Sequence, residues 1–389
     1  MSAQPATHRP PPWRDVRILR IVAQLVFLAL VAAFVFFLYM NLVANLRRLG
    51  ITLNFDFLRR SAGFAIADSP FRSSQPVRDA IQVGLGNTIR VSALGIVLAT
   101  VLGVVVGVAR LSSNWIVRRA AALFVESLRN VPVLAIIFFW YFAVLLRLPP
   151  IADAHDWLGL AVLSSRGVVM PGPEQTAPLG LFLALLGLGA VAAVAVAVWR
   201  TRRFDRTGEP HRRVLWALGV LTAAFAVAYL VGGRPFAITT PERGDLATAG
   251  GFRLSPEFAA LLIALVLYTA SHIAEIVRGS ILSVSRGQTE AAHALGLSEF
   301  QRMRFVILPQ AFRISVPPLA NQYLNLTKNS ALGAAIAMPE LTRVVQIAIS
   351  QGNPAPQLIA IAMAIYLFLS LTISLFTNLL NRRLQRAHR

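Results

Sequence analysis

Cysteine is absent from this 389-residue sequence, and lysine occurs once, at Lys328. Without cysteine the chain forms no disulfide and holds no metal ion through thiolates. Its cysteine content therefore does not indicate whether it lies in an oxidising or a reducing compartment. A phosphate-binding P-loop requires GxxxxGK followed by Ser or Thr, whereas Lys328 lies in Thr-Lys-Asn-Ser with no glycine at the required offsets. If ATP drives this protein, we therefore expect another polypeptide to hydrolyse it.

Charged residues are also scarce, at 14% of the chain, whereas hydrophobic residues make up 56% and the mean hydropathy is +0.64. A helix that crosses the ~30 Å hydrocarbon core of a membrane needs ~20 predominantly apolar residues. The sequence holds eight runs of about this length, at about 19–43, 87–109, 120–146, 178–199, 213–233, 256–277, 311–337 and 356–380. These runs predict an all-α fold, a polytopic transmembrane helix bundle of about eight spans.

The net charge of +20 comes mainly from arginines in short segments between the apolar runs. This distribution is typical of a protein oriented in lipid by its basic loops, and it does not favour nucleic-acid binding. With both termini in the cytoplasm, 22 arginines lie inside, 12 outside, and Arg90 and Arg129 within spans. The positive-inside rule therefore predicts cytoplasmic termini. Only the loop 44–86 opposes this orientation, because it would lie outside with six arginines.

Small residues recur every four positions in the second apolar run, at Gly95, Ala99, Gly103 and Gly107. This spacing places them on one helix face, where another backbone can approach closely. The stripe predicts a packing helix and indicates no particular function.

The most specific segment is the basic loop 278–310. Residues 285–297, SRGQTEAAHALGL, predict a short helix that ends at Gly296. Ser298 is placed to cap a second helix, which we expect Pro309 to stop. Two short helices joined by a glycine form a compact knob suited to the cleft of a cytoplasmic partner. The alternative is an amphipathic helix that lies on the lipid headgroups.

Several short motifs lie in and around this loop. They are Ala274-Glu275-Ile276, Arg278-Gly279, Gly287-Gln288, Glu290-Ala291-Ala292, Ala294-Leu295-Gly296, Ile307-Leu308-Pro309-Gln310 and Pro339-Glu340-Leu341. Together they resemble the permease subunits of ABC importers for polar amino acids. The resemblance implies a type I importer core whose 285–298 helix couples to an ATPase. The coupling residues it implies are Glu290, Ala291, Ala292, Gly296, Leu308 and Pro309.

The resemblance also implies a division of the chain. Residues 84–147 and 256–380 would form the two parts of the permease core, the second containing the coupling loop 278–310. The other segments would be a cytoplasmic leader 1–18, an extra N-terminal transmembrane anchor 19–43, an outer loop 44–83, inserted loops with two peripheral spans 148–255, and a cytoplasmic tail 381–389. An enlarged, eight-span chain resembles the broad-specificity L-amino-acid subgroup of these permeases.

By this resemblance the chain is a transport subunit in a bacterial inner membrane and not an enzyme. The implied partners are ABC ATPase subunits, a second and paralogous permease subunit, a periplasmic amino-acid-binding protein and membrane lipid, but no nucleic acid. ATP and Mg would be bound by the partner ATPase, and no cofactor by this chain.

The apolar run 311–337 is unusually polar for a membrane span. We expect Pro317-Pro318 to break it, and a polar stripe follows, made of Asn321, Gln322, Asn325, Lys328 and Asn329. Polar groups inside a membrane usually face a cavity or a partner, and interrupted helices often hold a transporter's binding site. We therefore predict a substrate pathway lined by Tyr268, Ser271, Gln322, Asn325, Lys328 and Asn329. The alternative is that these groups only hydrogen-bond neighbouring helices.

Two of the predicted pathway residues bear on specificity. In related permeases that carry cationic amino acids, the positions matching Gln322 and Asn329 tend to be acidic. An amide donates and accepts hydrogen bonds but cannot neutralise a buried cation. The resemblance therefore implies a pathway without a fixed preference for cationic side chains.

Other polar residues within spans indicate local contacts. His272 and Glu275 lie one turn apart, but no second such pair accompanies them, so a metal site is disfavoured. Glu275 and Arg278 are spaced for an ion pair. Glu126, Arg129 and Asn130 either satisfy one another or support a gate.

Two rival classes fit less well. A secondary amino-acid transporter or a channel would explain the polar span but would leave the glycine-hinged knob without a partner. An intramembrane enzyme would need a nucleophile with its base or a set of metal ligands, which the sequence does not show.

Overall fold

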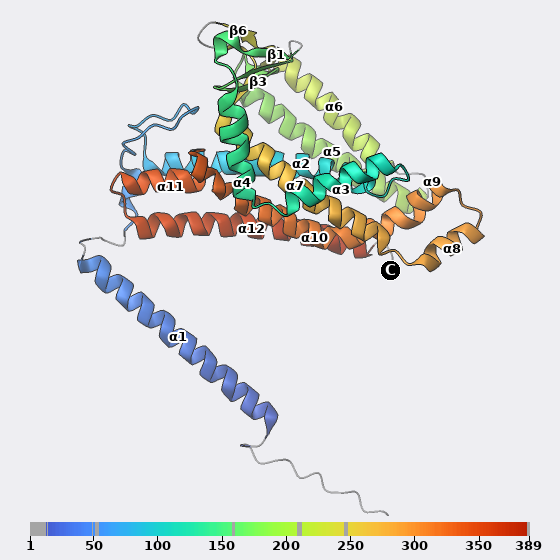
Figure 1. Cartoon of the computed structure of the whole chain (residues 1–389), viewed down its shortest axis with the longest axis horizontal. Coiled ribbons are helices and arrows are strands. Elements are labelled where there is room, and N and C mark those ends of the chain that lie inside the picture. Colours follow the sequence, from blue (N-terminus) through green and yellow to red (C-terminus); the bar gives the residue numbers. More distant parts are fainter. Residues whose placement is uncertain are drawn as a thin grey trace, which may run out of the picture.

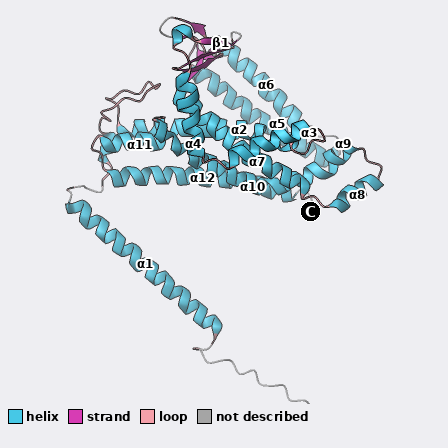
Figure 2. Cartoon of the chain, viewed as in Figure 1, coloured by secondary structure: helices cyan, strands magenta, loops and turns pink. Residues whose placement is uncertain are grey.

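The computed structural model describes residues 13, 15–48, 50, 54–157, 160–207, 212–244 and 248–386. The predicted leader therefore lies mostly outside the described residues, as do residues 387–389 of the predicted tail. The described chain is predominantly helical (Figures 1 and 2), as predicted. Six helices within it are long and apolar enough to cross a membrane: α1 (Val16–Arg48), α2 (Val77–Ala109), α5 (Leu179–Thr207), α6 (Arg213–Val231), α7 (Pro256–Leu282) and α12 (Ala355–Arg386).

Two further candidate spans are bent pairs of helices. In the first, the chain bends by 104° between α3 (Trp115–Arg129) and α4 (Val133–Phe138), which continues as a π turn Phe139–Val144. The prediction of one span over 120–146 is therefore wrong in detail. Pro132 explains the break, because it donates no backbone hydrogen bond and disfavours helical geometry in the preceding residue. Counting each bent pair as one span gives up to eight spans in the described chain, the predicted number.

The centre of the bundle is the contact between α2 and α7. Gly95, Ala99, Gly103 and Gly107 are all buried, which confirms the predicted packing stripe. A Cβ added at Gly103 would lie 2.6 Å from Ile273 Cβ, and one added at Gly107 would lie 2.8 Å from the carbonyl oxygen of Ala274. Glycine is thus required for the close approach of these two helices.

The second bent pair contains α10 (Leu308–Asn329) with a 3₁₀ turn Ser330–Ile336, followed after a bend of 44° by α11 (Leu341–Ser350). Pro317 and Pro318 lie inside α10, so the prediction that they break the span is wrong. Proline has a φ close to the helical value, and packing against neighbouring helices compensates for the two lost backbone hydrogen bonds. The regular helix instead ends beyond Asn329.

The inserted spans α5 and α6 pack mainly against each other and form a hairpin beside the core (Figure 1). Phe182, Phe225, Tyr229 and Phe236 form an aromatic cluster at one end of this hairpin. The outer surfaces of both helices are mostly exposed apolar residues. This arrangement is what peripheral, lipid-facing spans require.

The loops on either side of α5 and α6 contain short strands, which the sequence had predicted only as connectors. Strands β1 (His155–Trp157), β2 (Ala161–Ser164), β3 (Gly167–Met170) and β8 (Phe252–Leu254) form an antiparallel sheet in the order β1-β2-β3-β8. Two-stranded ribbons pair β4 (Gly172–Gln175) with β5 (Phe236–Thr239), and β6 (Glu242–Arg243) with β7 (Thr248–Ala249). Figure 2 shows these strands gathered at one end of the inserted hairpin. β8 leads directly into α7.

The segment before α2 packs on the bundle rather than forming an open loop. Phe57, Phe64 and Phe71 are buried in a hydrophobic cluster with residues of α11 and with Leu358 of α12. Helix α2 begins at Val77, about ten residues before the predicted span. This segment positions Asp68, whose backbone φ is +54°.

Candidate functional site

The predicted knob forms around helix α8 (Arg286–Ala294), which lies at one end of the bundle with the short helix α9 (Glu299–Arg302) (Figure 1). Gly296 follows α8 with a φ of +71°, and the amide of Leu297 donates to the carbonyl of Ala292 at 3.1 Å. A residue with this φ is usually glycine, since a Cβ is strained there. The predicted helix end at Gly296 is therefore confirmed.

The predicted coupling residues differ in exposure. Glu290, Ala291 and Gly296 are exposed, whereas Ala292 is buried on the inner face of α8. Leu295 presents 79% of its surface to the outside. Leu295 directly follows the last residue of α8, so the knob offers both an exposed carboxylate, at Glu290, and an exposed apolar side chain for contact with another molecule.

The second half of the loop is continuous with a spanning helix. Ser298 forms a capping box with Gln301 at the start of α9, as the sequence predicted. A π turn, Met303–Ile307, then connects α9 to α10, and Pro309 lies in the first turn of α10. The prediction that Pro309 stops this helix is wrong, because the wider π turn precedes it and a proline is tolerated in a first helical turn. Leu308 and Pro309 are both exposed.

Contacts within the loop fix α8 to the start of α10. Gln310 Nε2 donates to Gln288 Oε1 at 3.4 Å, and the Arg302 guanidinium contacts the His293 ring. Arg302 also pairs with Glu299 at 2.9 Å. The Gln288–Gln310 bond thus links α8 to the first turn of α10, the helix that carries the polar stripe.

Glu275 is the centre of a charged cluster near the same end of the bundle. It pairs with Arg278 at 2.5 Å, which confirms the predicted local pair, and also with Arg110 of α2 and, at 3.7 Å, with Arg129 of α3. The sequence did not indicate the last two contacts, because they join residues distant in the chain. The amide of Asn130 instead donates to the backbone carbonyl of Glu126.

Four polar side chains of the stripe on α10 have no bonding partner among the residues that the structure describes. The side chains of Gln322, Asn325, Lys328 and Asn329 make no hydrogen bond or ion pair with any described residue. Asn325 and Lys328 are exposed, and Gln322 and Asn329 are half-buried. Two of these four groups are therefore exposed and two are partly covered, and none of them bonds to another described helix.

One residue of the stripe, Lys328, lines a cavity among the described helices. Lys328 lies at a cavity of about 650 Å³ between α10, α11 and α12, together with Thr342, Gln346 and Tyr366. Gln322, Asn325 and Asn329 are not among the lining residues of this cavity.

The two predicted pathway residues on α7 lie deeper in the bundle. Ser271 is fully buried and its hydroxyl donates to the carbonyl of Tyr268 at 2.6 Å. Tyr268 is half-buried and its ring contacts that of His272 edge-on. Tyr268 packs against the same hydrophobic cluster as Tyr323 of α10, the neighbour of Gln322. The structure adds a contact that the sequence missed, because Thr100 Oγ1 of α2 donates to Tyr323 Oη of α10 at 3.0 Å.

Comparison with known proteins identifies the kind of protein to which this arrangement belongs. The family described as binding-protein-dependent transport system inner membrane component matches residues 99–389. The chain belongs to this family. The matched segment takes in residues 99–147 of the first part of the predicted core and the whole of the second part, with the α8 loop and the polar stripe. It is therefore a multi-pass permease of the inner membrane, as the sequence motifs indicated.

Three curated relatives match this permease along most of its length. The general L-amino acid transport system permease protein AapQ of Rhizobium johnstonii is 38% identical over 96% of this chain and 94% of its own. The putative amino-acid ABC transporter permease protein YhdX of Escherichia coli is 39% identical over 93% of each chain. The glutamate/glutamine/aspartate/asparagine transport system permease protein BztB of Rhodobacter capsulatus is 36% identical over 96% of each. Such coverage includes the inserted hairpin, which is therefore not peculiar to this permease.

Proposed function

We propose that this permease is the transmembrane subunit of an ATP-driven importer for L-amino acids of broad, polar specificity. The observation that carries the proposal is the exposed α8, held against the first turn of α10 by the Gln288–Gln310 contact. A separate ATPase that binds α8 would, on changing conformation, displace α8 and with it α10, which carries the polar stripe. The three full-length relatives, all described as amino-acid permeases or transport-system permeases, support the substrate class.

The remaining partners follow from the same proposal. ABC ATPase subunits bind ATP and Mg, a periplasmic binding protein delivers the amino acid, and a paralogous second permease completes the pathway. The unpartnered Gln322, Asn325 and Asn329 support this last element, because polar groups on a spanning helix are costly unless a cavity or a partner satisfies them. The arginine distribution supports cytoplasmic termini and an α8 on the cytoplasmic side.

The pathway proposal also concerns residues of α7. We propose that Tyr268 borders the pathway, since its ring is half-buried, while the fully buried Ser271 fixes the local conformation through its bond to Tyr268. Neutral amides on α10 suit substrates with different side chains, because they impose no fixed charge.

Reconstitution tests the proposal. The permease, its co-purifying partners and the matching binding protein are placed in vesicles, and uptake of glutamine, glutamate and arginine is measured with and without internal ATP. We expect uptake that requires ATP and an ATPase polypeptide that co-purifies with the permease. Uptake by the permease alone, driven by an ion gradient, would instead support the alternative of a secondary transporter.

A further inference from the structure

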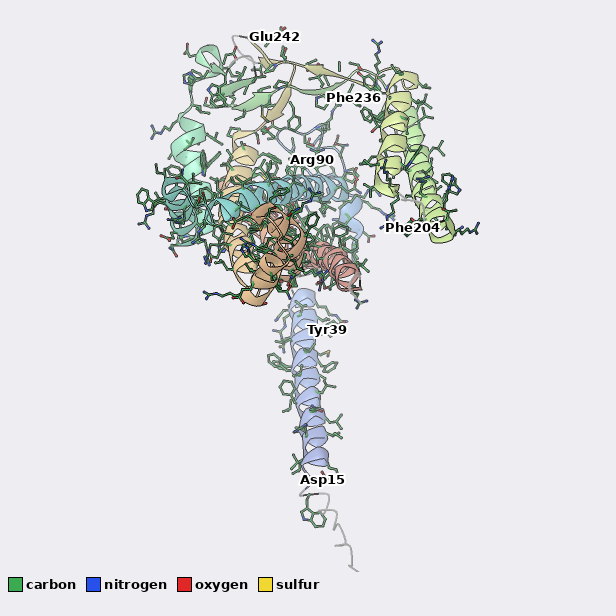
Figure 3. All side chains as sticks on the ribbon, turned by 90° about the vertical axis from the view of Figure 1, so that its right-hand side faces the viewer. Asp15, Tyr39, Arg90, Phe204, Phe236 and Glu242 are labelled. Atoms are coloured by element: carbon green, nitrogen blue, oxygen red, sulfur yellow. The ribbon has the colours of Figure 1, made fainter. Side chains whose placement is uncertain are left out.

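Arg90 of α2 is a charged side chain without a partner among the described residues. It is exposed and makes no ion pair or hydrogen bond with any residue that the structure describes. Figure 3 shows it between the core helices and the strands above them. An arginine in an apolar helix is costly unless it meets a cavity or an opposite charge. The cavities and charges near Arg90 therefore indicate which kind of group its guanidinium can bind.

The packing of α2 on α7 gives the depth of Arg90. Gly103 faces Ala270 and Ile273, and Gly107 faces Ala274 and Val277, so the two helices run side by side in the same direction. Because both helices have the same rise per residue, the residues opposite Arg90 lie about as far before Ala270 in α7 as Arg90 lies before Gly103 in α2. Arg90 is therefore level with the first turn of α7. Arg90 thus lies at the end of the bundle opposite α8, rather than halfway across the membrane.

A cavity of about 570 Å³ opens at this level. Its polar lining comes from four elements: the segment before α2, α2 itself, β8 and the N-terminus of α7, with Asp68, Asn87, Arg90, Arg253 and Ser255. Its apolar lining includes Leu94, Phe252, Phe258 and Met338. A cavity of this size and mixed lining suits a small molecule, not a macromolecule. A neighbouring cavity of about 490 Å³ shares Asp68, Asn87 and Arg90.

The charges around this cavity are complementary to a zwitterion. The guanidinium of Arg90 can bind a carboxylate through two parallel hydrogen bonds, and the N-terminus of α7 adds positive potential nearby. Asp68 supplies a negative charge for an ammonium group. Its only ion pair among the described residues is a loose one with Arg253, at 3.9 Å, and both side chains are about half exposed.

The cavity also adjoins the far end of α10. Asn87 Nδ2 donates to the carbonyl of Pro339 at 2.9 Å, and Met338 and Pro339 line the cavity. These residues follow the 3₁₀ turn Ser330–Ile336, whose rise of ~2 Å per residue puts Asn329 within about 15 Å of the cavity.

We propose that this cavity is an outer binding site for a free α-amino acid, with Arg90 holding the α-carboxylate and Asp68 the α-ammonium group. The amino acid occupies it on the outer side before it moves along α10. The inference rests on the proposed function and adds a site that lies outside the predicted pathway residues.

Cysteine protection tests the site, because the chain has no cysteine of its own. Ala67 is exposed and lines the cavity, so Ala67→Cys gives a reporter for an impermeant maleimide. The complete importer carrying Ala67→Cys is reconstituted in vesicles without binding protein, and the labelling rate is measured against L-glutamine, L-glutamate and the carboxylate-free amine ethanolamine. We expect glutamine and glutamate to slow labelling and ethanolamine to leave it unchanged. A cysteine at Ser73, which does not line either cavity, should show no protection.

Two variants assign the charges. In the Ala67→Cys background, Arg90→Gln should raise the glutamine concentration for half-protection at least about tenfold, since a charge-assisted bidentate contact is lost. Asp68→Asn should have a smaller effect in the same direction, and asparagine tolerates the positive φ at this position. Arg78→Gln is the matched control, because Arg78 is on the same helix, pairs with Asp79 and lines neither cavity.

Three results would overturn the proposal. They are protection that Arg90→Gln does not weaken, protection that follows the fraction of phosphatidylglycerol in the vesicles instead of the amino acid, and, in a parallel sample that receives binding protein and no amino acid, protection by the binding protein alone. The first result would show that Arg90 does not bind the amino acid. The second would show that Arg90 binds lipid phosphate, and the third that the cavity region is a docking surface for the binding protein. ATP-dependent uptake by the unaltered importer is measured in parallel. Uptake without protection at Ala67→Cys would contradict the outer binding site and still support the proposed function.

Discussion

The carboxylate of Glu340 joins two helices through a hydrogen bond from Tyr366 Oη of α12, at 2.8 Å. Glu340 is fully buried, and its two oxygens also accept the amides of Thr342 and Arg343 at the N-terminus of α11. A buried carboxylate is tolerated only when hydrogen bonds satisfy it. The motif Pro339-Glu340-Leu341 thus fixes α11 against α12, close to the outer cavity.

Removing the tyrosine hydroxyl should destabilise the permease. Tyr366→Phe leaves a buried carboxylate one donor short, which costs about 1.5–3 kcal/mol for a hydrogen bond to a charged group. We expect the melting temperature of the purified permease in detergent to fall by several degrees. Tyr39→Phe, at an exposed position of α1, is the matched control and should leave it unchanged. Equal melting curves for the two variants would contradict the assigned contact.

Valine substitutions at Gly296 and Gly352 distinguish an effect of backbone strain from an effect on coupling to the ATPase. Gly296 and Gly352 have φ values of +71° and +84°, and nothing lies within 4 Å of a Cβ added at either position. Valine should therefore cost a similar conformational strain, of order 1–2 kcal/mol, at both sites. We expect Gly296→Val to abolish substrate-stimulated ATP hydrolysis in the reconstituted importer, while Gly352→Val retains most of it. Similar activities for the two variants would show that only strain was being measured.

The orientation can be read from single cysteines. Ser73 lies in the segment proposed to be outside, and Thr207 at the end of α5 proposed to be inside; both are exposed. In intact cells, an impermeant maleimide should label Ser73→Cys and leave Thr207→Cys unlabelled until the membrane is permeabilised. The reverse pattern would invert the topology.

Acidic side chains on α10 should change specificity. Gln322 and Asn329 are seven residues apart on one continuous helix, a distance of about 10 Å along its axis. In the double variant Gln322→Glu/Asn329→Asp, two carboxylates in a poorly solvated pathway should favour cationic substrates several-fold. Competition between arginine and glutamine for uptake measures the shift, with Gln351→Glu, at an exposed position after α11, as control. An unchanged ratio of arginine to glutamine uptake would show that residues of α10 do not determine substrate selectivity.

Local patterns in the sequence predicted much of this fold. The apolar runs correspond to the candidate spans, the glycine stripe to the α2–α7 contact, and Ser298 to a capping box. Each of these features depends on residues within a few positions of one another. Periodicity and capping rules describe such features directly.

The features that the sequence missed depend on distant residues or on packing. Three arginines meet Glu275 from α2, α3 and α7, and the spacing of the sequence indicated only Arg278. Pro132 marks a sharp bend whereas Pro317 and Pro318 do not, because the neighbours of a proline decide whether a helix continues. Strands of two to four residues also gave no alternation long enough to distinguish them from connecting loops.

The most direct test of the account is a photo-cross-link from α8. A benzoylphenylalanine at Leu295, the most exposed apolar side chain of the knob, should cross-link to the ATPase polypeptide when the importer is illuminated in membranes. The same group at Leu181 of α5, also exposed and proposed to face lipid, should give no such product. Cross-linking of Leu295 to lipid alone would contradict the account, because α8 would then be an interfacial helix and not the contact through which ATP hydrolysis moves α10.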